Sequence, residues 1–109
     1  MTIRIKDRDY NFIVRSWWGP MYKFEDIMQV GEHPERKFNP YLTFHLHVMF
    51  YCILLCDNED IDLGLEEFLA ALDDITLCNQ LRDHYDKRLA VLIPPAGENR
   101  QGEDSKKKP

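Results

Sequence analysis

The chain has 109 residues, with 44% hydrophobic residues, 30% charged residues and a net charge of −5. A chain of this length forms one domain, and these fractions are those of a soluble globular protein. The acidic balance argues against a nucleic-acid-binding protein, which needs a basic face. Lys106, Lys107 and Lys108 form only a short run beside acidic residues, so we interpret them as part of a solvated tail.

The N-terminus alternates charged and apolar residues from Met1 to Asp7 and has no continuous apolar run, so it does not resemble a secretory signal. Three cysteines without an export signal predict free thiols and a cytoplasmic protein. The apolar run from Tyr41 to Cys56 is shorter than the roughly 20 residues that a membrane-spanning helix needs, and it includes His45 and His47. We therefore expect no membrane segment.

Residues 2–15 are expected to form a β-hairpin. Ile3 and Ile5 alternate with polar residues, and so do Tyr10, Phe12 and Val14. The polar residues between the two strands, Asp7-Arg8-Asp9, lack the glycine of the tightest turns, which predicts a loop of three to four residues.

A first helix is predicted over residues 20–30. Gly19-Pro20 can begin it, Met21, Phe24 and Met28 share one face, and Gly31 is placed to stop it. Residues 32–37 are expected to be a polar loop.

The most apolar part of the chain predicts a buried central helix over residues 41–56. It contains no charged residue, glycine or proline. Asn39-Pro40 resembles a helix start, with asparagine as the N-cap and proline in the first turn. Because nearly every face of this helix is apolar, the rest of the protein or another subunit must surround it.

Two more helices are predicted over residues 65–73 and 76–93. The second carries an apolar stripe that ends before Pro94-Pro95 (Leu77, Leu81, Tyr85, Leu89 and Leu92). Residues 94–109 have no apolar anchor and are expected to be a disordered tail. The predicted architecture is α+β: one globular domain over residues 1–93, in which the hairpin packs on a bundle of about four helices.

The acidic segment between Asp57 and Asp74 partly matches the pattern of a calcium-binding loop. Starting at Asn58, Asp60 and Asp62 fall at ligand positions, but Leu63 replaces the required glycine and Leu69 replaces the bidentate glutamate. A solvated loop explains the segment better. We predict no calcium site.

The three thiols, Cys52, Cys56 and Cys78, are candidate zinc ligands and candidate nucleophiles. On one helix, Cys52 and Cys56 can share a metal ion, but His45 lies too far along the axis to join them. No thiol or candidate base (His33, His45, His47 or His84) lies in a recognisable catalytic motif. We expect no cofactor, no metal and no enzymatic activity.

Trp17 and Trp18 are adjacent, so an extended backbone directs them to opposite sides. We expect Trp17 to fill the core, while Trp18 lies either under a loop or in an interface, where tryptophan is enriched among energetic anchors. The predicted interface comprises Trp17, Trp18, Met21 and Phe24.

The order of these parts resembles the tail assembly chaperone-like proteins of tailed phages and prophages. The resemblance spans about residues 2–90, and the segments that carry it are Ile3-Arg4-Ile5 with Tyr10, the first helix up to Gly31, Phe50–Leu55, and Glu67–Asp74. The entry Trp17-Trp18-Gly19-Pro20 and the basic-ended tail depart from the pattern.

The resemblance implies a non-catalytic protein that coats a helical tape-measure protein until the tail tube assembles around it. Surplus apolar helix surface with an acidic rim suits an amphipathic helical partner, self-association, or both. Two alternatives stay open: a small regulatory or antitoxin-like adaptor, and a small thiol- or metal-dependent hydrolase.

Overall fold

The computed structural model describes residues 1–92 of the chain. It contains an antiparallel hairpin, β1 (Thr2–Ile5) and β2 (Arg8–Asn11), followed by the helices α1 (Trp18–Met28), α2 (Thr43–Asp57), α3 (Leu65–Ala71) and α4 (Ile75–Leu92). A short 3-10 helix, η1 (Pro34–Arg36), lies in the expected polar loop. The predicted α+β architecture is confirmed. The tail expected over residues 94–109 lies outside the described residues.

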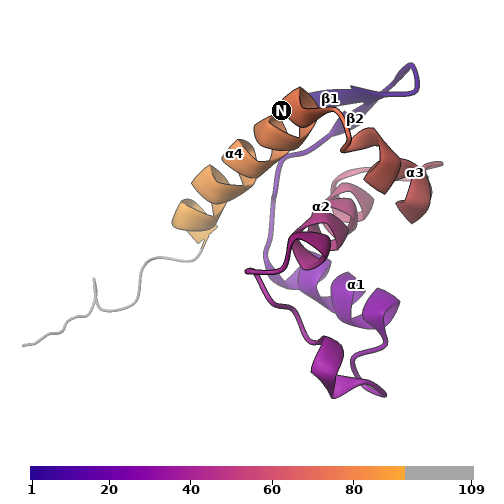
Figure 1. Cartoon of the computed structure of the whole chain (residues 1–109). Coiled ribbons are helices and arrows are strands. Elements are labelled where there is room, and N and C mark those ends of the chain that lie inside the picture. The colour runs from indigo at the N-terminus through magenta and orange to yellow at the C-terminus, as the bar shows by residue number, and fades with distance from the viewer. Residues whose placement is uncertain (93–109) are drawn as a thin grey trace, which may run out of the picture.

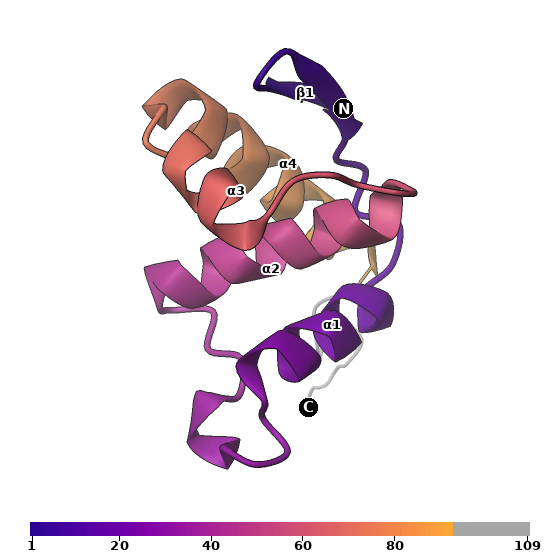
Figure 2. The ribbon, with the colours of Figure 1, turned by 90° about the vertical axis from the view of Figure 1, so that its right-hand side faces the viewer.

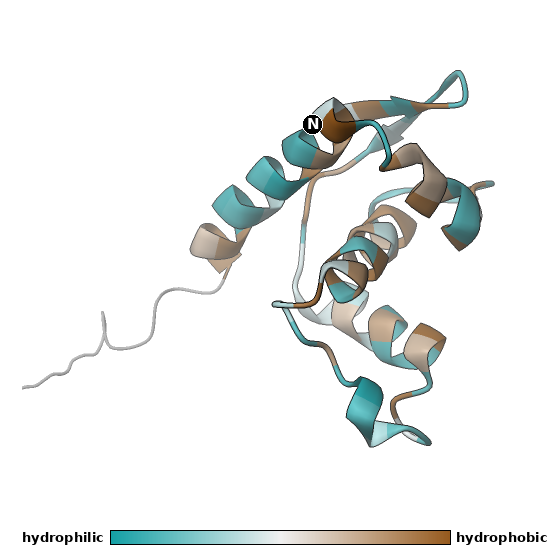
Figure 3. Ribbon diagram, viewed as in Figure 1, coloured by the Kyte–Doolittle hydropathy of each residue, from teal (hydrophilic) through white to brown (hydrophobic). Residues whose placement is uncertain are grey.

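Helix α2 occupies the centre of the fold (Figure 1), with α1 on one side and α3 and α4 on the other (Figure 2). Nine of its fifteen residues are buried, and they cover most of the circumference of the helix. By contrast, many residues of α4 are hydrophilic (Figure 3). The charge-free run therefore forms the buried central helix that its composition predicts, because an apolar helix is most stable when it is removed from water.

Aromatic side chains connect the other elements to α2. The ring of Phe50 packs edge-on against Phe12, which follows the hairpin, at 5.8 Å between centroids, and against Tyr85 of α4 at 5.1 Å. On another face, Tyr51 packs against Phe68 of α3 at 5.8 Å, and its hydroxyl donates a hydrogen bond to Leu63 O at 2.7 Å. Such pairs are each worth about 1 kcal/mol beyond the area they bury.

The hairpin turn is tighter than predicted. Ile5 pairs directly with Arg8, so only Lys6 and Asp7 form the turn, with φ of 51° and 63°. Positive φ at both central positions is the signature of a type I′ turn, whose twist matches that of the strands. The predicted three- to four-residue loop is wrong, because a lysine and an aspartate take the left-handed conformation that glycine normally supplies.

The second strand also ends earlier than predicted, at Asn11. Val14 has φ of 58°, a strained conformation for a β-branched residue, and the chain turns there away from the sheet. Residues 12–16 instead cross towards α1.

Helix α1 begins at Trp18, two residues before its predicted start. Pro20 is its third residue, where the missing N–H costs no helical hydrogen bond. The helix ends at Met28, and its C-cap Gln29, with φ of 56°, supplies the left-handed conformation expected of Gly31. Phe24 lies near His45 of α2, whereas a Cβ on Gly19 would lie 3.4 Å from Cys56 Sγ, so the two helices are antiparallel.

The start of α2 differs from the prediction as well. Asn39 Oδ1 accepts a hydrogen bond from Tyr41 N–H at 2.9 Å and forms a turn before the helix. The helix begins at Thr43, with Leu42 as an N-cap that makes no side-chain hydrogen bond. Asn39 N–H donates to Nδ1 of the buried His45 at 2.9 Å, which occupies this imidazole nitrogen.

Candidate functional site

The outer face of α1 carries an exposed aromatic pair. The side chains of Trp18 and Tyr22 are 63% and 66% exposed, and their rings stack at 6.4 Å with an interplanar angle of 23°. The two residues are four positions apart, so the helix itself places one above the other. Leaving two large aromatic rings exposed to water costs free energy, and aromatic residues are enriched in protein contact sites.

The inner face of α1 carries the other predicted interface residues. Phe24 is 0% exposed and packs edge-on against Phe38 at 5.2 Å. Trp17 and Met21 are partly buried against the core, and Trp17 packs edge-on against Phe38 at 6.1 Å. Phe24 is thus a core residue that a partner cannot touch while the fold is intact, and the interface prediction is corrected at this position.

The C-terminal end of α1 is acidic. Glu25, Asp26 and Glu32 line a shallow hollow of about 440 Å³ together with Gln29 and Gly31. The outer surface of α1 therefore runs from an aromatic pair at its start to a group of carboxylates at its end. We call this surface, made of Trp18, Tyr22, Glu25, Asp26 and Glu32, the α1 outer surface.

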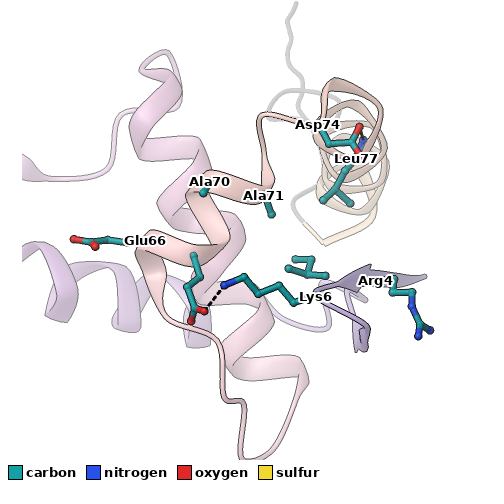
Figure 4. A pocket seen from close by; sticks show the side chains of 9 residues that line it. Arg4, Lys6, Glu66, Ala70, Ala71, Asp74 and Leu77 are labelled. Atoms are coloured by element: carbon teal, nitrogen blue, oxygen red, sulfur yellow. Dashed lines mark hydrogen bonds and ion pairs between the residues drawn. The ribbon is translucent and has the colours of Figure 1, made fainter.

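A groove of about 590 Å³ lies between the hairpin, α3 and the start of α4 (Figure 4). Its floor is apolar, with Ile5, Ala71 and Leu77. Lys6 reaches from the hairpin turn to Glu67 of α3, and Lys6 Nζ lies 2.7 Å from Glu67 Oε2. This exposed ion pair bridges the hairpin and α3 at one side of the groove.

Glu67 has a second role at the start of α3. Its Oε1 accepts a hydrogen bond from Gly64 N–H at 3.0 Å, which satisfies a backbone donor at the N-terminus of the helix. The hydrogen bond from Lys6, with the one from Gly64 and the charge of Lys6, holds the pKa of Glu67 below its ordinary value.

The acidic segment that follows α2 has structural roles. Asn58 Nδ2 donates to Asn11 O and its Oδ1 accepts from Asn11 N–H, both at 2.9 Å, so its amide pairs with the backbone at the end of the hairpin. Asp62 lies 3.8 Å from Arg8 in an exposed ion pair. Within residues 1–92, no three histidine, cysteine or acidic side chains are grouped so that they could hold a metal ion.

The three thiols lie in different environments. Cys52 is fully buried, and burial raises its pKa to about 12. Cys56 is exposed, and partial burial of its thiol still raises its pKa. Cys78 lies on α4, and its Sγ is 3.6 Å from Nε2 of His47 on α2. This last pair was not predictable from the sequence, because its members lie on different helices.

Of the residues on the α1 outer surface, only Trp18 was predicted to face a partner. Tyr22 was missed, although its spacing of four from Trp18 is a signal that the sequence contains. The acidic end of α1 was not predicted, because it has fewer acidic residues than the segment after α2.

Comparison with known proteins identifies no relative of this chain. No family model, no curated protein and no solved structure matches this chain. Among the described residues, no helix has both the length and the apolar character needed to span a membrane.

Proposed function

We propose that this chain is a non-catalytic protein-binding module of the tail assembly chaperone kind, which holds a helical partner on the α1 outer surface. The observation that carries the proposal is the stacked, exposed pair of Trp18 and Tyr22. Aromatic residues of this kind dominate the binding energy of interfaces, because they bury a large area with few rotatable bonds.

The charges of the α1 outer surface define the partner. Glu25, Asp26 and Glu32 follow the aromatic pair along the helix, and Lys23 is the one base within α1. An amphipathic helix that places apolar side chains against Trp18 and Tyr22, and basic side chains one to two turns away, complements both parts. A segment of a tape-measure protein with this pattern is the partner that the family resemblance implies.

The test measures binding of helical peptides to the whole chain by fluorescence anisotropy. We expect a peptide with an apolar stripe and lysines at one end to bind more tightly than the same peptide with glutamates there. Trp18→Ala and Tyr22→Ala should each weaken binding by at least about tenfold, the effect of losing an aromatic anchor. Tyr41→Ala is the matched control, because Tyr41 is 92% exposed and lies outside α1.

Charge reversal gives a second readout. The double variant Glu25→Lys, Asp26→Lys should reverse the preference between the two peptides, because the attraction at the end of α1 changes sign. Failure of the wild-type chain to bind either peptide, or equal losses for Tyr22→Ala and Tyr41→Ala, would contradict the proposal.

Self-association is examined in parallel by light scattering over a concentration series. A dimer that Trp18→Ala dissociates would make a second copy of the chain the occupant of the α1 outer surface. That outcome would overturn the assignment of the tape-measure partner.

A further inference from the structure

Cys78 and His47 form a thiol–imidazole pair between two helices. They are 31 positions apart, and the separation of 3.6 Å between Cys78 Sγ and His47 Nε2 is that of a hydrogen bond to sulfur. Both side chains are partly exposed. Among the described residues, no other thiol has a hydrogen bond to an imidazole.

The pair opens into a hollow of about 340 Å³ between α2 and the start of α4. Leu46, Phe50 and Leu72 form its apolar wall, and Asn79 and Arg82 lie on its polar side. The volume is at the lower end of the range for small-ligand sites. The hollow therefore combines a nucleophile, a base, a cation and an apolar surface.

His47 has the protonation state that a base requires. Partial burial, and then the charge of Arg82, lower the pKa of the imidazole below its ordinary value. The ring is thus mainly neutral at pH 7, and in the tautomer that carries its proton on Nδ1, Nε2 can accept the proton of the Cys78 thiol. A neighbouring base of this kind is the usual way in which a protein activates a cysteine.

The geometry limits the reaction that this pair can carry out. The backbone N–H of Cys78 donates to Asp74 O at 2.9 Å within the first turn of α4. The N–H at or next to a nucleophile is a common donor to the oxyanion in acyl transfer, and here it is already used. Thiol–disulfide exchange forms no oxyanion and needs only the thiolate, access and a proton acceptor.

We propose that Cys78 is a modification site that forms a mixed disulfide with a small anionic disulfide of the glutathione class. His47 takes the thiol proton, and Cys78 Sγ attacks one sulfur of the disulfide. The new S–S bond forms as the old one breaks, and the other half leaves as a thiolate that takes a proton from His47 or from water. Cys78 is oxidised and the leaving half is reduced.

Arg82 selects the anionic reagent. Its Nε donates to the carboxylate of Asp86 at 3.3 and 3.4 Å, which uses one of its three nitrogens. The remaining two can bind a carboxylate of the ligand while its disulfide lies against Cys78. This site lies on α2 and α4, so it goes beyond the proposed function of the α1 outer surface.

The test measures the rate at which each cysteine of the whole chain is modified, by mass spectrometry of its peptides after incubation with oxidised glutathione at pH 7.5. We expect Cys78 to react at least about tenfold faster than Cys56, although Cys56 is more exposed, because His47 takes the thiol proton to give the attacking thiolate and Arg82 attracts the anionic reagent. Equal or faster modification of Cys56 in the wild-type chain would overturn the proposal, and this comparison needs no variant.

Two variants separate the roles of the neighbours. His47→Gln should slow Cys78 about tenfold, and an unchanged rate in a folded variant would overturn the role of His47. Arg82→Gln should slow the reaction with oxidised glutathione but not with the neutral reagent bis(2-hydroxyethyl) disulfide. Equal slowing with both reagents, or with neither, would overturn selection by Arg82.

Discussion

The carboxylate of Asp57, at the end of α2, holds Val14 in a left-handed conformation. Asp57 Oδ2 accepts hydrogen bonds from Val14 N–H at 3.0 Å and from Ile13 N–H at 2.7 Å. Val14 has φ of 58°, a conformation that costs about 1–2 kcal/mol for a residue with a Cβ. Two charge-assisted hydrogen bonds to a buried carboxylate offset that cost and fix the path from the hairpin to α1.

Replacement of Asp57 should therefore be among the most destabilising changes outside the apolar core. We expect Asp57→Ala to lower the free energy of unfolding by about 3 kcal/mol, because two backbone donors lose their charged acceptor in a buried site. Asp57→Asn should cost less, since an amide oxygen can still accept a hydrogen bond. Urea denaturation measures both, with exposed Glu59→Ala as a control that should change the free energy by less than about 0.5 kcal/mol.

The sequence predicted the elements of the fold but not the contacts between them. Helix α2 was recognisable because a long apolar run without glycine or proline has few other stable arrangements. The role of Asp57 was not recognisable, because the residue stands at the head of an acidic segment and looks like a solvated charge. Its partners are backbone N–H groups more than 40 positions away, and no local pattern marks them.

The candidate site also has some features with a local sequence signal and others that depend on tertiary contacts. The helical spacing of Trp18 and Tyr22 is local and readable, whereas the burial of Phe24 depends on Phe38 and His45, which come from the next loop and the next helix. The pairing of Cys78 with His47 depends on how α4 packs across α2. Such contacts follow from tertiary packing, which periodicity cannot predict.

The type I′ turn of the hairpin leads to a prediction of increased stability. Asp7 has φ of 63°, and glycine takes this conformation without steric cost. Asp7→Gly should raise the free energy of unfolding by about 0.5–1 kcal/mol. The backbone carbonyl of Asp7, which accepts a hydrogen bond from Arg4, is retained. Asp9→Gly, within β2, is the control and should be destabilising, so stabilisation by both changes would contradict the assignment of the turn.

The ion pair between Lys6 and Glu67 predicts a dependence of stability on pH. The pKa of Glu67 is lower in the folded state, chiefly because of the hydrogen bond from Lys6. The contribution of Glu67 to the free energy of unfolding is therefore complete above the ordinary carboxyl pKa of about 4.3. This contribution is lost as the pH falls through the lower pKa of the folded state. Lys6→Met should raise the pKa of Glu67 towards its ordinary value, as followed by NMR titration. An unchanged pKa in this variant would show that Lys6 does not bind Glu67 in solution.

The two faces of α1 predict very different effects on stability for two aromatic substitutions only six positions apart. Phe24→Ala should lower the free energy of unfolding by about 3–5 kcal/mol, because it removes a fully buried ring that packs against Phe38. Trp18→Ala should change it by less than about 0.5 kcal/mol, since the indole packs mainly on the exposed Tyr22.

Thermal and urea unfolding of both variants, with peptide binding measured on the same samples, separates stability from recognition. Trp18→Ala should bind the helical peptide more weakly, while its free energy of unfolding stays close to that of the wild-type chain. Phe24→Ala, to the extent that it stays folded, should lose stability and keep its affinity per folded molecule. A large loss of stability in Trp18→Ala would mean that the ring supports the domain itself, because a side chain that contributes only to binding leaves the free protein unchanged.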